Sequence, residues 1–313
     1  MLINASGRTD IAAYYSEWLM ERIAEGFVLS RNPLYPDQVH RYRLISDVVD
    51  CLIFCTKNPA PMLPHLQELK ERGFAVFFYV TITSYGPDIE PRVPEYHQVM
   101  EAFQQLSRMV GKNRVCWRYD PILVNASYTV EHHLRCFREM AAALSPYTER
   151  CIFSFVQLYQ KLAVTFPELR AVSAVDKKIL LTELGQLARQ YGLSLQTCGD
   201  SNDYTAYGIE RSGCLSASVL EKALGRELKP LRPKPTRQGC GCLPSSDIGA
   251  YDTCPNGCRY CYATRDHDWA LRNYQQHDPH SPLLLGHLQL GDQIIDAKQE
   301  RFVKPIQQLT LGW

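Results

Sequence analysis

The sequence predicts an α/β fold, a full or partial (β/α) barrel with parallel strands, on three observations. Short apolar runs alternate with helical patterns through residues 1–200. The runs are apolar almost throughout, as in parallel strands whose two faces are both covered. No G-x-G-x-x-G follows any of them, which disfavours a doubly wound dinucleotide-binding sheet. The barrel is therefore the predicted architecture.

The expected elements follow one another in regular order. Strands are expected at 2–5, 48–55, 75–82, 114–119, 151–156 and 194–197, and helices at 11–25, 60–72, 95–110, 129–144 and 175–191. A glycine follows most of these helices, and glycine readily adopts the left-handed conformation that ends a helix. Asp10 and Thr129 are suitable N-caps for the first and fourth helices. The longer connection 27–44 is expected to form a small hairpin or an extended excursion.

Composition narrows the class of protein. Hydrophobic residues make up 45% of the chain and charged residues 21%, with a net charge of +1, so nothing indicates a general attraction to nucleic acid or membrane. No apolar run approaches the roughly 20 residues of a membrane helix. The N-terminus lacks the charged and apolar regions of a signal peptide. We therefore expect a cytoplasmic protein with no membrane partner.

The chain contains 12 cysteines, and in a reducing compartment these indicate metal binding rather than disulfides. The cysteines help to divide the chain into a barrel core, 1–200, and a cysteine-rich segment, 201–313, that completes the barrel and holds a metal centre. Some lie in apolar strand-like or amphipathic helical contexts and are expected to be buried thiols: Cys51, Cys55, Cys116, Cys136 and Cys151. The others gather between residues 198 and 261.

The strongest candidate site is the C-x3-C-x2-C motif of Cys254, Cys258 and Cys261. Pro255 and Gly257 let the backbone turn, so that the thiolates can face one point. Three thiolates leave a 4Fe–4S cluster with one iron that has no protein ligand, and this open iron is where chemistry could happen. Structural zinc is one alternative, with Cys258 and Cys261 as half of a ligand set, and a redox thiol group or a chance spacing without metal is the other. The spacing favours the iron–sulfur cluster.

A second metal site is suggested by the remaining late cysteines. They are Cys198, Cys214, Cys240 and Cys242, and four thiolates suffice for an auxiliary iron–sulfur cluster or a tetrahedral zinc ion. The alternative is that two of them are buried thiols and that the C-G-C stretch is only a local pair.

Polar residues recur where the chain leaves the predicted strands, and in such folds the working face lies at the carboxyl ends of the strands. The candidate catalytic residues are Arg8, Asp10, Lys57, Arg118 and Asp120. Three cations on one rim would suit an anionic group such as a carboxylate or phosphate. Each residue also has a simpler explanation, because loop ends are polar, Asp10 can cap a helix and Asp120 precedes a proline.

Several stretches together resemble DUF1848, a bacterial and archaeal family. The matching stretches are S-G-R-T-D-I (6–11), F-C-T-K-N-P (54–59), W-R-Y-D-P (117–121), D-I-G-A-Y-D-T-C (247–254) and the cysteine loop. The family is known chiefly for a C-terminal cysteine cluster similar to that of radical S-adenosylmethionine (SAM) proteins. The stretch R-Y-C-Y-A (259–263) is also similar to the cluster loop of the spore photoproduct lyase-like branch.

The resemblance implies an enzyme that generates a 5′-deoxyadenosyl radical from SAM and abstracts hydrogen from a substrate that the sequence does not identify. Tyr260 and Tyr262 would contact the adenine, and an electron donor such as flavodoxin or ferredoxin would be a partner. A nucleic-acid repair or modification enzyme of the same chemistry is one alternative, suggested by the basic connector 229–237. A non-catalytic binding protein stabilised by zinc or an iron–sulfur cluster is another.

The position of the motif departs from the radical SAM pattern. There the cluster loop follows the first barrel strand, whereas here it lies near the C-terminus. A circular permutation would explain this, with a strand at 248–252, the loop and a helix at 266–276 completing the barrel from the C-terminal end. The Gly-Gly-Glu element that holds the SAM amino group in that family is replaced at the first strand end by Ser6-Gly7-Arg8.

Overall fold

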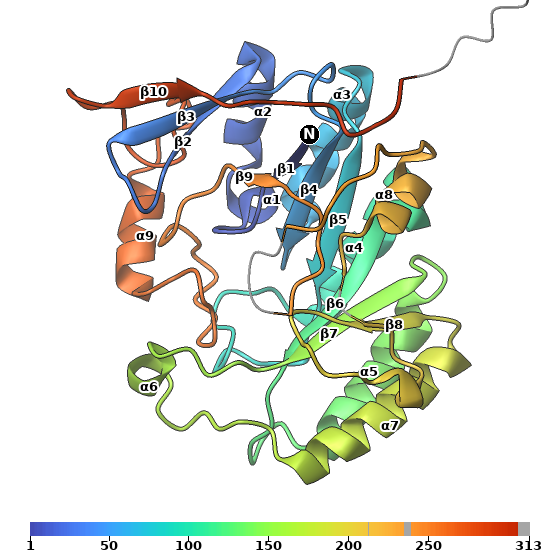
Figure 1. Ribbon diagram of the computed structural model, residues 1–313. Helices are drawn as coiled ribbons and strands as arrows, with labels where there is room; N and C mark the ends of the chain where they lie inside the picture. Colours follow the sequence, from blue (N-terminus) through green and yellow to red (C-terminus); the bar gives the residue numbers. More distant parts are fainter. Residues whose placement is uncertain (212, 235–238, 306–313) are drawn as a thin grey trace, which may run out of the picture.

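The computed structural model describes residues 1–211, 213–234 and 239–305. Its centre is a seven-stranded sheet in the order β8-β7-β6-β5-β4-β1-β9, in which all neighbouring strands are parallel (Figure 1). The strands are β1 (Leu2–Asn4), β4 (Cys51–Thr56), β5 (Val76–Thr81), β6 (Val115–Ile122), β7 (Arg150–Phe155), β8 (Ser194–Thr197) and β9 (Ser246–Asp247). The fold is therefore α/β with an open parallel sheet, consistent with a partial barrel, and the predicted strands of the barrel core are confirmed.

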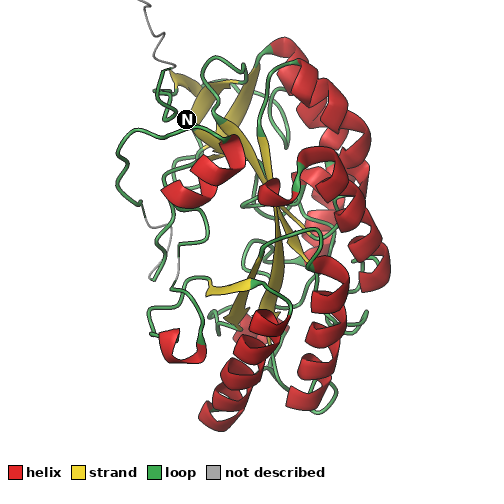
Figure 2. Ribbon diagram, turned by 90° about the vertical axis from the view of Figure 1, so that its right-hand side faces the viewer, coloured by secondary structure: helices red, strands yellow, loops and turns green. Residues whose placement is uncertain are grey.

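Most helices cover one side of this sheet (Figure 2). They are α1 (Ile11–Tyr14), α2 (Ser16–Glu25), α3 (Leu66–Glu71), α4 (Tyr96–Val110), α5 (Val130–Leu144) and α7 (Ala174–Gln190), with the short 3-10 helices η1 (Ala60–His65) and η2 (Lys112–Arg114) between them. Two predicted helices are divided. The first breaks at Tyr15, and the second begins as a 3-10 helix that contains Pro64, which has no N–H to donate.

The predicted helix ends are confirmed in detail. A carboxylate oxygen of Asp10 accepts a hydrogen bond from the Ala13 N–H at 3.1 Å, and the Thr129 hydroxyl accepts one from the His132 N–H at 3.2 Å. Gly26 ends α2 with a left-handed φ of 80°. These local signals fix where each helix starts or stops and hence where the next strand begins.

Connection 27–44 forms the expected hairpin, β2 (Phe27–Arg31) and β3 (Gln38–Arg43). A late strand, β10 (Gln293–Asp296), pairs in parallel with β3 and makes a three-stranded sheet that the sequence did not predict. The remaining short elements are α6 (Leu162–Thr165), η3 (Thr205–Tyr207), α8 (Ala217–Leu224) and α9 (His267–Gln275).

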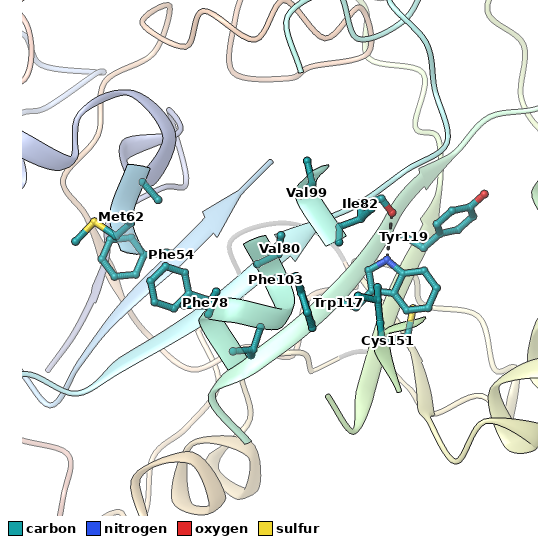
Figure 3. Packing of buried hydrophobic residues seen from close by; sticks show 14 of the residues in the cluster. Phe54, Met62, Phe78, Val80, Ile82, Val99, Phe103, Trp117, Tyr119 and Cys151 are labelled. Atoms are coloured by element: carbon teal, nitrogen blue, oxygen red, sulfur yellow. Dashed lines mark hydrogen bonds between the residues drawn. The ribbon is translucent and has the colours of Figure 1, made fainter. Parts of the chain in front are cut away.

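The main core lies between the sheet and its helices. Phe54 and Phe78 stack with ring centroids 4.6 Å apart, and the Trp117 indole N–H donates to the Ile82 carbonyl at 3.1 Å (Figure 3). These bulky residues of β4, β5 and β6 anchor the helices, because burying an aromatic side chain removes a large apolar area from water.

The opposite face of the sheet is covered by the C-terminal third of the chain. Ile53 and Phe77 of the sheet form a cluster there with Leu215, Leu220 and Leu243. Segment 201–313 also supplies β9, which pairs with β1. Both parts of the chain therefore contribute strands to one sheet.

Two expectations need correction. The strand expected at 248–252 is Ser246–Asp247 instead, because the Asp247 carboxylate accepts from the Gly249 N–H at 2.8 Å and turns the chain out of the sheet. Cys55 is half-buried, whereas the other four cysteines expected in the core are buried. Part of the basic connector, 235–237, lies outside the described residues. No helix within the described ranges is long and apolar enough to cross a membrane.

Candidate metal centre

Asp252, at the start of the cysteine loop, forms hydrogen bonds with residues at the end of the loop. Its backbone has a positive φ of 56°. Aspartate tolerates this left-handed conformation better than most residues. The Asp252 N–H donates to the Ala263 carbonyl at 3.0 Å, and its carboxylate accepts from the backbone N–H and the guanidinium of Arg265. The loop 252–265 is thus closed at its base.

Within the loop, two turns bring the cysteines into one region. Gly257 has a left-handed φ of 73°, and the Cys261 N–H donates to the Cys258 carbonyl at 3.0 Å. Cys258 is buried, while Cys254 and Cys261 are half-buried. The three cysteines therefore share one short, tightly turned loop.

This loop lies over the carboxyl ends of β1, β4 and β5. The Asn256 side chain donates to Asp10 at 3.3 Å and accepts from the Tyr14 hydroxyl at 2.8 Å, next to the end of β1. The Arg259 N–H donates to the Ile89 carbonyl at 3.0 Å, in the connection that follows β5. The loop accordingly lies at the edge where a parallel α/β sheet places its reactive groups.

The surroundings of the thiols oppose their ionisation without a cation. Burial raises the pKa of Cys254, and the negative charges of Asp10 and Cys261 add to the effect. Burial also raises the pKa of Cys258 well above its usual range, with the Glu90 carboxylate as the next cause. Within the described ranges, no three His, Cys, Asp or Glu side chains are arranged as ligands of a single metal ion.

A buried ion pair stands beside the loop. The Lys57 ammonium lies 2.7 Å from the Glu90 carboxylate, and the side chains are 11% and 2% exposed. The Thr83 hydroxyl donates to the same carboxylate at 2.8 Å, and so does the Tyr260 hydroxyl. Because of Tyr260, this network joins the ends of β4 and β5 to the cysteine loop. Although burial acts against it, the Glu90 charge raises the pKa of Lys57.

The other candidate cations also have carboxylate partners. Arg118 pairs with Asp120, which in turn accepts from the Ser154 hydroxyl. Arg8 lies 4.0 Å from the carboxylate of Asp247. The expected rim of three cations is therefore already balanced by acidic side chains, and this arrangement gives no support for binding an anionic group. Asp10 caps α1 and also accepts from the Lys57 N–H at 2.8 Å.

The two tyrosines of the loop differ in their surroundings. Tyr260 is engaged by Glu90, and its ring centroid lies 5.7 Å from the Lys57 ammonium. Tyr262 is 52% exposed, and its hydroxyl donates to the Gly7 carbonyl after β1. Of these two tyrosines, Tyr262 is therefore the more exposed, and Tyr159 lies next to it at a centroid distance of 6.3 Å.

A cavity of about 480 Å³ opens at the carboxyl ends of β7 and β8, beyond Tyr159. Its lining residues include Ser154, Gln157, Tyr159, Lys177, Cys198 and Asp200. Tyr159 thus stands between the cysteine loop and a space large enough for a small molecule.

Sequence reasoning missed Glu90, Tyr159 and Lys177. Each lies in a connection or on a helix surface rather than directly at a strand end, so that no spacing rule marked it. Of the second set of cysteines, Cys214 and Cys242 are in contact, with their sulfurs 3.2 Å apart. Cys198 lines the cavity, and Cys240 is half-buried.

A family model described as "Domain of unknown function (DUF1848)" matches residues 2–263. The protein therefore belongs to this family. A search of curated proteins finds no match. Among solved structures, a candidate alpha-L-fucosidase from Bacteroides thetaiotaomicron aligns with 12% identity over 56% of this chain and 72% of that chain, with a TM-score of 0.25. At this TM-score the likeness carries no argument about fold or function.

Proposed function

We propose that the protein is a radical SAM enzyme that holds a 4Fe–4S cluster on Cys254, Cys258 and Cys261. The observation that carries the proposal is the position of the cysteine loop. It leaves the sheet directly after β9 and lies over the carboxyl ends of β1, β4 and β5. Reactive groups of parallel α/β folds are placed at this edge.

The donor set fits such a cluster. Thiolates are the ligands of iron–sulfur clusters, and three of them leave one iron open for a substrate or cofactor. In a cluster each thiolate binds a different iron, so the sulfurs stand further apart than around one ion. The Ala263 N–H donates to the Cys261 sulfur at 3.4 Å.

The strand order supports a circularly permuted barrel. β9 is an edge strand that pairs in parallel with β1, so the sheet runs β9-β1-β4-β5-β6-β7-β8 in space. Read from that edge, the cysteine loop follows the first strand and α9 follows the loop. This is the order expected of a radical SAM core whose first unit stands at the C-terminal end of the chain.

When bound, the cluster supplies the electron that cleaves SAM to methionine and a 5′-deoxyadenosyl radical. The chain's own residues would orient the reactants and exclude water. The exposed ring of Tyr262 is suited to stacking on the adenine, while the Lys57–Glu90 pair holds Tyr260 in place. The substrate would enter the cavity at β7 and β8, on the far side of Tyr159 from the loop.

The test is anaerobic reconstitution with iron and sulfide, followed by electron paramagnetic resonance of the reduced protein with and without SAM. We expect a 4Fe–4S signal that changes when SAM is added and is lost in Cys258→Ala. Cys136→Ala is the matched control, because Cys136 is a buried thiol on α5 outside the loop. Zinc without iron would refute the cluster. A cluster whose spectrum does not change when SAM is added would refute the radical mechanism. The cluster would then be a redox or structural centre.

A further inference from the structure

A second group of cysteines gathers where the C-terminal segment crosses the sheet. The sulfurs of Cys214 and Cys242 are 3.2 Å apart. The Leu215 N–H points to the Cys242 sulfur at 3.4 Å, and the Leu243 N–H donates to the Leu215 carbonyl at 2.9 Å. Two segments distant in sequence are therefore joined at these two residues.

Close backbone contacts at glycines bring Cys198 and Cys240 to the same place. A Cβ atom on Gly239 would lie 3.1 Å from the backbone of Asp200 and of Ser201, so the chain just before Cys240 touches the loop just after Cys198. A Cβ on Gly213 would lie 3.8 Å from the Gly241 carbonyl. The segments at 198–201, 213–215 and 239–243 thus converge, and each brings cysteine with it.

We propose that Cys198, Cys214, Cys240 and Cys242 bind one tetrahedral zinc ion. Zinc–sulfur bonds of about 2.3 Å in a tetrahedron place the sulfurs about 3.8 Å apart. The contact between Cys214 and Cys242 is already near this separation, whereas the thiolates of a 4Fe–4S cluster bind different irons and stand further apart. The closeness of the pair therefore selects a single ion.

Three of the four thiols already contact one another. Cys198 hydrogen-bonds to Cys214, and Cys214 contacts Cys242. A bound zinc ion would displace the thiol protons to solvent, and the resulting thiolates would turn toward the ion.

The zinc site would hold in place the C-terminal segments that cover the second face of the sheet. The Tyr79 hydroxyl of β5 donates to the Cys214 carbonyl at 2.9 Å, and Leu215 and Leu243 pack against that face. Residues 239–243 have no helix or strand of their own to hold them there. A zinc ion would cross-link these segments and so supply folding free energy, as structural zinc does in small domains.

The experiment uses the full chain in a Cys254→Ala/Cys258→Ala/Cys261→Ala background, so that metal at the cysteine loop cannot contribute. Purified without added iron, this protein is expected to hold about one zinc ion per chain by mass spectrometry. Adding Cys214→Ser and Cys242→Ser should reduce zinc to background, while Cys136→Ser should not. Replacement by cobalt should give the visible bands of a tetrahedral thiolate site.

A second measurement keeps the proposal testable if the serine variants do not fold. In the same triple-alanine background, a strong chelator is expected to lower the thermal midpoint, and zinc alone is expected to restore it. Iron with sulfide at this site would overturn the single-ion assignment. So would a Cys214–Cys242 disulfide without metal, detected as two fewer titratable thiols, or intact thiols with no bound metal. Each result is independent of whether the cysteine loop holds a cluster.

Discussion

Removing one partner of the buried Lys57–Glu90 pair should be far more damaging than removing both. In Lys57→Met, the Glu90 carboxylate, 2% exposed, keeps only neutral hydroxyl partners. Leaving a buried charge uncompensated costs about 3–5 kcal/mol of unfolding free energy. Glu90→Leu leaves the Lys57 ammonium in the same position, so we expect a similar loss.

The double variant Lys57→Met/Glu90→Leu removes both charges and should recover much of this loss. Two hydroxyls, of Thr83 and Tyr260, then lose their acceptor, at about 1 kcal/mol each. We therefore expect a total loss of about 2 kcal/mol, well below the sum of the single variants.

The assay is urea unfolding of the metal-free, reduced protein, followed by circular dichroism. The matched control is Lys304→Met, which breaks an ion pair of the same 2.7 Å length whose side chains are 49% and 77% exposed, and it should cause no measurable loss. If the two single losses simply add in the double variant, the pair is not coupled and the reasoning from its burial is wrong.

Three further predictions concern a glycine, a histidine and an aspartate. Gly7→Ala would place a Cβ 2.0 Å from the Asp247 carboxylate, so the Asp247 side chain must move; a loss of about 1 kcal/mol in urea unfolding is expected, and an unchanged midpoint would contradict this contact. Burial lowers the pKa of His133 from 6.5 to about 4, so the unfolded chain takes up the proton first. The contribution of His133 to stability, measured as the difference between the wild type and His133→Gln, should be constant above pH 6.5 and fall by about 3 kcal/mol as the pH drops to 4; identical pH profiles of the two proteins would contradict this. Asp252→Asn keeps a residue that tolerates positive φ but weakens the bonds to Arg265, whose side chain is 68% exposed, so it should cost only about 1 kcal/mol, whereas Asp252→Ala should cost more; equal losses would mean that φ does not matter there.

Local signals predicted much of the fold, because they act over a few residues. The apolar runs located the strands, and Asp10, Thr129 and Gly26 fixed helix ends through bonds within one turn. The position of the motif, late in the chain, led to the expectation that the C-terminal segment adds a strand to the barrel. β9 does join the sheet, beside β1.

Contacts between residues far apart in the sequence could not be predicted from such local signals. The pairing of Lys57 with Glu90 depends on how the connection between β5 and α4 folds back toward β4. No pattern in the sequence predicts that path. The same holds for β10, which meets β3 across most of the sequence. The sequence therefore located the cations of the candidate site but could not show that each is neutralised by a carboxylate.

The pairing of β1 with β9 also constrains how the chain can fold during synthesis. β1 is made first and can pair with β4 early, but its other edge has no partner until Ser246 and Asp247 have left the ribosome. An open strand edge is a template for pairing with other chains. A nascent or truncated chain that ends before residue 246 should therefore be prone to aggregate, and its dependence on chaperones should end only when the last third of the protein is complete.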